Sequence, residues 1–586
     1  MLAAAETFQL HFLDYLAFCS YLLIVCGIGF FAGRKVQGKS EDYFLAGRSL
    51  PWYVIGSSFI AANISSEHFI GMVGATYIFG ISVAMYEWGN INSFSVLIWL
   101  FIPFLLAARV FTIPEFLERR FNITLRQTFA VLSVVANIFA FLAAVLYGGA
   151  VAINALFGWP MWFAICALGI LTGVWAIYGG LKSVAWMDLF TLFIMVIGGV
   201  LVAICGLYML SGDEHSLVKG WEVMIEANRA KTGVWAQAVS QNAQNMAATD
   251  TYNRLSVIQP VTHIVVPWPC FIYGFLASGI WYSALNQFMI QRVFGAKNMY
   301  HARMGIVFAG YLKIIMPVIV VLPGLILFAK MPEIMLQPWE EIRPAADKSY
   351  IRMLQLVVPI GIRGLFLAAL FGAIQSTVNA VLNSTATLVT LDIYKRMINK
   401  TASDKRLVSM GVMTSICIII TSILIAMLIA KMKIGLFMYI QNLYSFFAPP
   451  FAAVFLLGIL FKRINAKGAT TAIFAGFIFE IFLKLYLFYM PELFGKATYH
   501  IMYSFNNQAF FTWLFCVIVC CSISLMTAPP RPEQVGDELS LNWKKMNIFG
   551  ELGDKWYKSV ILWWGFFAAC IIALIITFSQ IVFSDL

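Results

Sequence analysis

Long apolar runs alternate with short polar segments through nearly all of the 586-residue chain. A membrane-spanning helix needs about 20 predominantly apolar residues, and fourteen runs are long enough. They lie at about 14–33, 51–79, 82–107, 125–157, 160–179, 186–211, 262–291, 304–329, 354–390, 407–430, 435–460, 466–490, 508–528 and 560–583. The pattern predicts an all-α polytopic membrane protein with 14 transmembrane helices. The boundary between the second and third runs is the weakest, because only Gly80 and its neighbours separate them.

Composition and charge agree with this prediction. The chain is 61% hydrophobic and 11% charged, with a mean hydropathy of +0.84, whereas soluble proteins carry about 25% charged residues. The net charge of +11 would suit nucleic-acid binding, but most of the 39 Lys and Arg residues lie in alternate loops. Those loops are therefore predicted to be cytoplasmic and both termini extracytoplasmic. We expect a multi-pass protein of the plasma or inner cell membrane, in contact with lipid and with no nucleic-acid partner.

The runs also suggest how the chain is divided. We expect a first flanking helix and cytoplasmic loop (1–50), a first group of five helices (51–211), an extracellular loop (212–261), a second group of five (262–460), and C-terminal helices (461–586) with a cytoplasmic linker at 529–556. The outer loop is expected to hold a short helix at 220–228, and a second outer loop at 330–352 to cap an entrance. The ten cysteines lie in or beside apolar runs and are expected to be unpaired.

The run at 51–79 is interrupted by polar residues, namely Asn63, Ser65, Ser66, Glu67 and His68. Such groups persist at membrane depth only where they face protein or line a cavity. A single histidine in a membrane span is more often a helix-packing donor, so His68 indicates a site only together with its polar neighbours. Five runs later, the segment ASGIWYS at 277–283 is a matching irregularity. Interrupted helices at corresponding positions of two inverted halves mark a solute site near the membrane midplane.

Several charged residues lie inside other apolar runs, where each costs about 2.5–3.5 kcal/mol. Glu480 and Lys484 are four residues apart and are expected to form a local ion pair. Arg363 is near the end of a run and can snorkel, and Asp188 lies near Lys182, which suggests a helix cap or an ion pair. Glu87 and Lys313 either pair with each other or face a polyhydroxylated solute.

Ser376 and Thr377 place two hydroxyls side by side in one run, and Gln441 adds a buried amide. Oxygen ligands suit sodium, with carbonyls of an unwound helix completing the shell, although such hydroxyls often bond to carbonyls of their own helix. No phosphate-binding GxxxxGK[ST] loop and no HExxH motif occur. We therefore expect a transporter driven by an ion gradient and not an enzyme.

Longer strings carry a resemblance to a known family. They are SEDYFLAGRSLPWYVIGSSFIAANISSEHFIGM, YEW, TIPEFLERRF, YGGLKSVAWMD, NQFMIQR with GAK, FAGYLKIIMP, LNSTATLVTLDIYKR and YIQNLYSFFAPPFAAVFLLG, within about residues 40–465. In these strings the chain resembles the sodium:solute symporter family, and within it the sodium/glucose and sodium/galactose cotransporters. The resemblance implies a LeuT-type 5+5 inverted repeat with additional flanking helices.

The resemblance also implies site residues. Sodium would be held by carbonyls of Ala61, Ile64 and Ala373 and by the hydroxyls of Ser376 and Thr377, with Asp188 linked to coupling or a second sodium. The solute would meet Asn63, His68, Glu87, Asn90, Tyr282, Ser283, Lys313 and Gln441, and the gate or pocket wall would be Met72, Tyr86 and Phe437.

Two positions depart from these relatives. Ser283 stands where glucose and galactose carriers have Trp, and Gly279 where bacterial relatives have Asn. Both changes remove bulk from one side of the pocket. We expect sodium-coupled import of a sugar or sugar-like solute by alternating access. The alternatives are a symporter for a sugar acid, polyol or other organic solute and, from another class, a non-concentrative channel or sensor.

Overall fold

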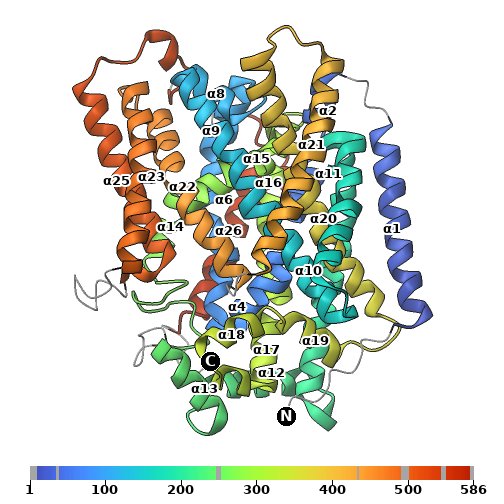
Figure 1. The fold of residues 1–586 in the computed structure, drawn as a ribbon. Helices are drawn as coiled ribbons and strands as arrows, with labels where there is room; N and C mark the ends of the chain where they lie inside the picture. Colours follow the sequence, from blue (N-terminus) through green and yellow to red (C-terminus); the bar gives the residue numbers. More distant parts are fainter. Residues whose placement is uncertain are drawn as a thin grey trace.

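The computed structural model describes residues 10–34, 39–245, 252–431, 435–489, 501–542 and 549–580. Within these ranges the chain is helical and has no strand, and Leu50 and Ala296 form an isolated bridge. Long helices run side by side between the two ends of the molecule, and short helices cover one end (Figure 1).

The first helices are α1 (Phe12–Gly33), α2 (Ser40–Leu45), α3 (Trp52–Asn63), α4 (Val73–Phe79), α5 (Met85–Trp88), α6 (Asn90–Val96), α7 (Ile102–Ala108), α8 (Ile113–Arg120), α9 (Ile123–Ala136), α10 (Ala143–Phe157) and α11 (Met161–Leu210). Next come α12 (Leu217–Arg229), α13 (Gly233–Asn245), α14 (Cys270–Gly274), α15 (Gln287–Phe294), α16 (Met299–Val320), α17 (Leu322–Lys330), α18 (Trp339–Ala346) and α19 (Ser349–Val357). The last are α20 (Arg363–Thr387), α21 (Asp404–Ile429), α22 (Leu436–Leu460), α23 (Ala466–Tyr489), α25 (Phe505–Met526) and α26 (Val560–Thr577).

Eleven helices in the described part of the chain are long and apolar enough to cross a membrane, by length and composition. Each of the fourteen predicted runs contains helix, but some are interrupted or joined. The runs at 160–179 and 186–211 both fall in α11, which is kinked at Gly180 (φ 56°, ψ −158°). The run at 262–291 is divided into short pieces. The architecture is therefore all-helical and multi-pass.

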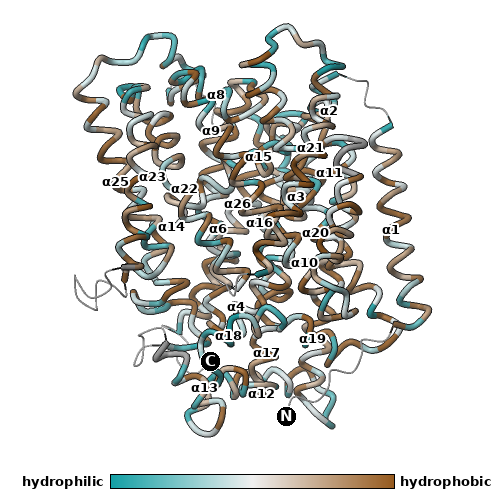
Figure 2. The backbone as a smooth tube through the Cα atoms, viewed as in Figure 1, coloured by the Kyte–Doolittle hydropathy of each residue, from teal (hydrophilic) through white to brown (hydrophobic). Residues whose placement is uncertain are grey.

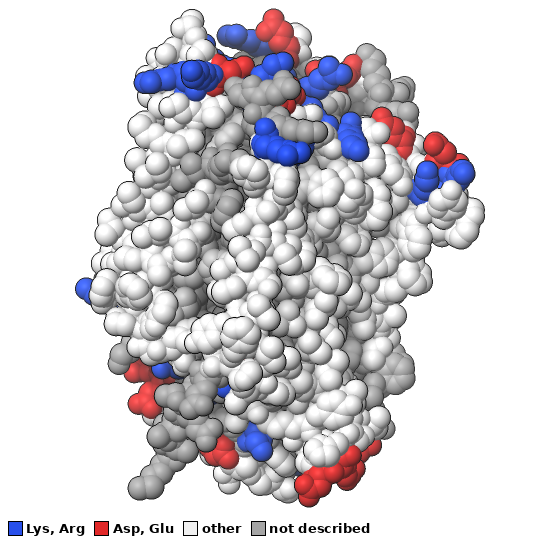
Figure 3. Space-filling view, turned by 90° about the vertical axis from the view of Figure 1, so that its right-hand side faces the viewer, with Lys and Arg blue, Asp and Glu red and all other residues white. Residues whose placement is uncertain are grey.

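Hydropathy and charge follow the long axis of the helices. Hydrophobic residues fill the middle of the molecule and hydrophilic ones gather towards its ends (Figure 2). On the face drawn in Figure 3, acidic and basic side chains cluster at the two ends, and the broad belt between them is almost uncharged. This distribution is the one expected of a protein surrounded by lipid.

The start of α1 and the segment after α26 lie at the same end of the molecule (Figure 1). At the start of α1, the Asp14 carboxylate accepts hydrogen bonds from the amides of Gly361 and Gly364, before and in α20. After α26, the Phe578 carbonyl accepts from the Val257 amide. This end also carries α12, α13, α18 and α19 (Figure 1). Helix α12 confirms the short helix expected at 220–228, and all ten cysteines are free, as predicted.

Gly80 forms the turn between α4 and the next helical segment. Its φ of +75° suits glycine, and a Cβ there would lie 2.2 Å from the Arg254 carbonyl oxygen. The Arg254 guanidinium is fully buried and donates to the carbonyls of Tyr77 (2.9 Å) and Ile78 (2.7 Å) at the end of α4. A cation at a helix C-terminus is favourable, so this contact ties the segment around Arg254 to the end of α4.

Candidate functional site

The polar interruption in the first long apolar segment is a true break. Helix α3 ends at Asn63, and Ile64 is extended (φ −74°, ψ 114°). Winding resumes as a π-helical segment, Glu67–Met72, that leads into α4. Carbonyls at such a break lack the helical partners they would otherwise have and are available to other groups.

The matching irregularity is π-helical and ends in a break. The segment at 277–283 is wound into π-helical turns (Phe275–Gly279 and Trp281–Leu285), and the chain becomes extended at Asn286 (φ −68°, ψ 117°). The Asn286 side chain accepts from the Phe288 amide (3.4 Å) and caps α15. The irregularity expected at 277–283 is thus present as π-helical winding, and the break follows it at Asn286, which offers a helix cap that the small residues lack.

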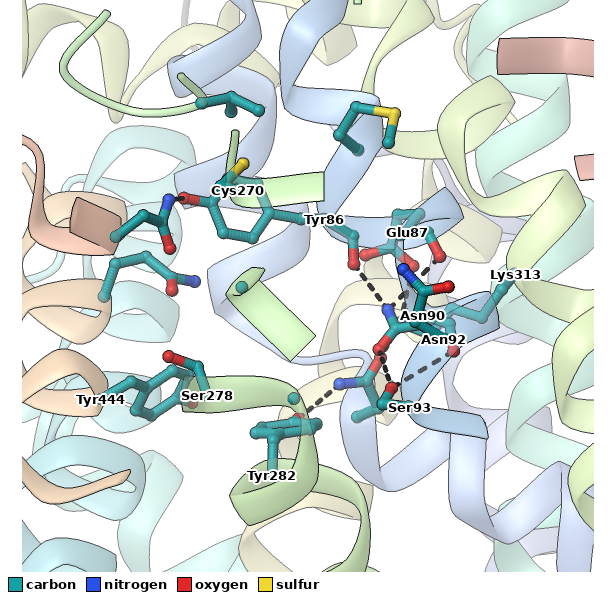
Figure 4. Close-up of a pocket in the computed structure, with 18 of the residues that line it drawn as sticks. Tyr86, Glu87, Asn90, Asn92, Ser93, Cys270, Ser278, Tyr282, Lys313 and Tyr444 are labelled. Carbon is teal, nitrogen blue, oxygen red and sulfur yellow. Dashed lines mark hydrogen bonds and ion pairs between the residues drawn. The ribbon is translucent and has the colours of Figure 1, made fainter. Parts of the chain in front are cut away.

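A cavity of about 160 Å³ lies beside the first break. Nine predicted solute and gate residues line it, namely Asn63, His68, Met72, Tyr86, Glu87, Asn90, Tyr282, Lys313 and Gln441. Figure 4 shows Glu87 and Lys313 together on one side, with Tyr282 and Tyr444 on the other. The volume resembles that of a cavity of about 150 Å³ that holds benzene, so one ring-sized molecule fits.

A chain of polar contacts crosses the cavity wall. Lys313 Nζ donates to Glu87 Oε2 (2.6 Å) and also to Asn63 Oδ1, and the Asn63 amide donates to the Tyr282 hydroxyl. His68 Nε2 lies 3.3 Å from Glu87 Oε1. His68 Nδ1 accepts from the Ser65 amide (3.4 Å), so the proton of the neutral ring is on Nε2 and faces Glu87. Glu87 and Lys313 do pair, and they do so at the cavity.

Some residues of the cavity lining, among them Glu67 and Tyr444, were not assigned to the site from the sequence. Gln441 Nε2 donates to Glu67 Oε1 (3.0 Å), and the Tyr444 hydroxyl lies 3.5 Å from Glu67 Oε2. Glu67 lies within the polar interruption, which was the available signal. Tyr444 follows Gln441 by three residues on α22, so helical spacing brings it to the same face. Asn92, Ser93 and Asn506 also line the cavity and carried no comparable signal.

Two predicted residues lie outside the lining. Ser283 is buried, and its hydroxyl donates to the Gly279 carbonyl one turn earlier in its own segment. Phe437 packs edge-on against Tyr86, with ring centroids 5.1 Å apart, and borders a smaller hollow near Gly71 and Asp347. The expectation that Ser283 faces the solute is therefore not supported, whereas Gly279 does line the cavity.

The hydroxyl of Thr377, on α20, reaches the first break. Its Oγ1 lies 3.0 Å from the Ala62 carbonyl oxygen and 3.2 Å from that of Ile64. The Thr377 hydroxyl thus contacts the carbonyl of Ile64, which was predicted as a ligand, and that of Ala62, which was not. Both Ala61 and Ala373 are fully buried, and Ala373 is one turn before Thr377 on the uninterrupted α20.

Asp188 gathers a second buried cluster. It accepts from Ser376 Oγ (2.6 Å) and from Ser58 Oγ (2.5 Å), and Arg292 lies 3.5 Å away. Arg292 also donates to the Ser58 hydroxyl (2.6 Å). The expected ion pair at Asp188 therefore forms with Arg292 of α15 and not with Lys182. Ser376 and Thr377 are adjacent, but one faces Asp188 and the other the break.

The other charged residues predicted inside apolar runs also have partners. Lys484 lies 3.7 Å from Glu480, which confirms the ion pair expected from their spacing. Lys484 also donates to Asn442 (3.1 Å). Arg363 donates to the Val358 carbonyl (3.2 Å).

The sequence of the chain is similar to that of known transport proteins. A sequence model of the sodium:solute symporter family matches residues 43–476. A sodium/glucose cotransporter of Vibrio parahaemolyticus is 34% identical over 557 residues, which are 92% of this chain and 96% of that protein. A sodium/myo-inositol cotransporter of Bos taurus is 33% identical over 552 residues, which are 90% of this chain and 75% of that protein.

A solved structure supports the same fold. It is the substrate-bound outward-open state of a Na⁺-coupled sialic acid symporter, with a TM-score of 0.70 and 21% identity, covering 89% of this chain and 99% of that one. Extensive identity with two cotransporters, a family match over most of the chain and a shared fold lead to one conclusion. The chain belongs to the sodium:solute symporter family.

Proposed function

We propose that this protein imports a neutral polyhydroxylated ring, such as a sugar or a cyclic polyol, together with sodium. The observation that carries the proposal is the ring-sized cavity whose donors and acceptors are continuous with a broken helix. A polyol leaving water needs both kinds of group to replace its hydration. Relatives named as sodium/glucose and sodium/myo-inositol cotransporters support this class of solute.

The charges around the cavity favour a neutral solute over a sugar acid. Lys313 is the only Lys or Arg among the described residues that line it, and Glu87 already pairs with this ammonium. Glu67 adds a second acidic group. Even with Glu67 protonated, no unpaired cation is left for a carboxylate, and desolvating an unpaired charge is costly. A sugar acid is therefore the second candidate.

The sodium ion is proposed to bind where Thr377 meets the break. The Thr377 hydroxyl and the carbonyls of Ala62 and Ile64 already converge there, and hard oxygen donors suit sodium. Ala61, Ala373 and Ser376 complete the proposed ligand set. Asp188, which accepts a hydrogen bond from Ser376, is proposed to couple this site to Arg292 or to bind a second sodium ion. Sodium would favour one arrangement of the break, to which solute binds better.

The finer architecture belongs to the same proposal. We infer fourteen spans in a LeuT-type 5+5 repeat over 51–211 and 262–460, with 1–50 and 461–586 flanking it. Breaks at Ile64 and Asn286, in the first span of each half, support this division. The end that carries α12 and α18 is proposed to face outward, because the loops at the opposite end hold most of the basic residues.

Uptake by the purified protein in liposomes tests the proposal. Labelled glucose, galactose, myo-inositol and glucuronate are compared with and without an inward sodium gradient. We expect one of the neutral rings to accumulate above its outside concentration only with the gradient. The double substitution Ser376→Ala with Thr377→Ala should abolish this accumulation. Equilibration without accumulation would support a channel, and unchanged sodium dependence in the double variant would refute the sodium site.

A further inference from the structure

The first turn of α25 reaches the cavity, although α25 lies outside the two five-helix groups. Asn506, the second residue of this helix, is part of the cavity lining. Its Nδ2 lies 2.6 Å from the Val265 carbonyl oxygen and 3.1 Å from the Tyr86 hydroxyl. The Tyr86 hydroxyl in turn donates to the same carbonyl (3.1 Å). Three segments far apart in the sequence are thus joined by a triangle of hydrogen bonds among the Asn506 amide, the Tyr86 hydroxyl and the Val265 carbonyl.

The donors and acceptors of this triangle match in number. The Asn506 amide has two N–H bonds and uses one on each partner. The Tyr86 hydroxyl accepts one hydrogen bond and donates one, and the Val265 carbonyl has two lone pairs and accepts two. Because Val265 presents only a carbonyl oxygen, the nitrogen of the Asn506 side chain must face it. An aspartate of the same shape has no N–H to donate.

The same turn of α25 holds a second wall of the cavity. The Tyr273 hydroxyl, on α14, donates to Asn507 Oδ1. The Tyr273 ring also stacks on Phe510, with centroids 4.1 Å apart. Cys270, which begins α14, lines the cavity and lies near Tyr86 in Figure 4. The start of α25 therefore fastens the α5 wall, through Tyr86, and the α14 wall, through Tyr273.

We propose that Asn506 is a positioning residue for transport, which holds Tyr86 against Val265 and so sets the affinity for solute and access to the cavity. This inference rests on the proposed function, because it assigns a role at the same cavity. Tyr86 is the residue before Glu87, and its ring meets Phe437 edge-on. Loss of the Asn506 contact would free the Tyr86 ring to move away from this edge of the cavity, which we call the rim, while the Glu87–Lys313 pair stays intact.

The test compares Asn506→Leu, Asn506→Gln, Tyr86→Phe and the double variant Asn506→Leu with Tyr86→Phe. We expect Asn506→Leu to raise the solute KM about threefold to tenfold, as for the loss of one or two hydrogen bonds. The sodium concentration for half-maximal uptake should stay the same. Asn506→Gln keeps both N–H groups and should restore part of the affinity. The KM of the double variant should not exceed that of the more impaired single variant, since both substitutions remove the same contact.

Alkylation of Cys270 by a polar maleimide, quantified by peptide mass spectrometry, gives a readout that needs no transport. We expect it to be about threefold to tenfold faster in Asn506→Leu than in the unaltered protein. Asn154→Leu is the matched control, because the Asn154 amide also donates to a backbone carbonyl, that of Trp159 (2.8 Å), away from the cavity. It should change neither KM nor the Cys270 rate.

Three results would overturn the inference. They are an unchanged KM and Cys270 rate in a folded Asn506→Leu variant, a lower melting temperature as its only effect, or multiplicative effects of the Asn506 and Tyr86 substitutions. If the unaltered protein takes up none of the four solutes, the proposed function fails, and the Cys270 rates still decide whether Asn506 holds the rim.

Discussion

Removing the ammonium of Lys313 is the sharpest perturbation of the cavity. Lys313 and Glu87 are 2.6 Å apart, and their side chains are 4% and 2% exposed. In Lys313→Met the Glu87 carboxylate keeps His68 at 3.3 Å as its remaining partner. Losing one member of a buried ion pair costs about 3–5 kcal/mol, whereas replacing both by uncharged groups is often neutral. Lys313→Met alone should therefore lower stability much more than Lys313→Met combined with Glu87→Gln.

Stability and transport must be measured separately to use this difference. Thermal unfolding in detergent, at one fixed scan rate because large proteins often unfold irreversibly, should rank Lys313→Met and Glu87→Gln below the double variant, and the double variant close to the unaltered protein. The double variant should nevertheless take up no solute, because it has lost the charged donor and acceptor. Arg119→Met is the matched control, since Arg119 pairs with Glu115 but its side chain is 45% exposed. Such a surface pair contributes about 0–1 kcal/mol.

Either of two results would refute this reasoning. A double variant as unstable as Lys313→Met would show that the lost stability does not come from an unpaired Glu87. A stable double variant that transports with an unchanged KM would show that the pair is structural and does not bind solute.

Three further predictions concern other contacts. Burial raises the pKa of Asp347, which accepts from the Leu436 amide (3.0 Å), to about 7. The folded protein therefore binds more protons than the unfolded one between about pH 4 and pH 7, and stability falls as pH rises through this range, by up to about 1.4 kcal/mol per pH unit. Asp347→Asn should flatten that dependence in thermal unfolding at pH 5 and pH 8, and an unchanged slope would contradict it. Gly80→Ala should lower the melting temperature more than Gly158→Ala, because both have positive φ but only the Gly80 Cβ would meet another atom. Equal effects would exclude the contact with Arg254. Asn63→Ala should remove the mutual dependence of sodium and solute affinity in equilibrium binding, and a preserved dependence would move the coupling elsewhere.

The helices and the first break could be predicted from the sequence because both are local. An apolar run long enough to span a membrane has few alternatives to a helix there. The polar residues from Asn63 to His68 interrupt the run at 51–79 within about one turn. The Glu87–Lys313 pair could be anticipated because neither charge is tolerable alone in lipid. Such arguments state that a partner is required without always identifying it.

Most of the contacts that were missed are set by packing between distant segments, and one is set by local π-helical winding. Asp188 requires a partner, but only the fold shows that Arg292 and not the nearby Lys182 supplies it. Ser283 was expected to face the solute because of its place in a family pattern, whereas π-helical winding turns its hydroxyl to Gly279. Asn506 follows a segment of mixed polar and apolar residues and precedes an apolar run, and nothing in its neighbourhood indicates a partner such as Tyr86.

The proposed coupling of ion and solute follows from the distances at one residue. Thr377 contacts the carbonyls of Ala62 and Ile64, on either side of Asn63. The Asn63 side chain contacts Lys313 and Tyr282 in the cavity. An ion that draws those two carbonyls together must therefore reorient the residue between them, and a solute that fixes Asn63 must favour the arrangement the ion needs. Because linkage is reciprocal, each ligand raises the affinity of the other by the same factor. A continuous helix would hold both carbonyls in its own hydrogen bonds, so the break itself makes this coupling possible.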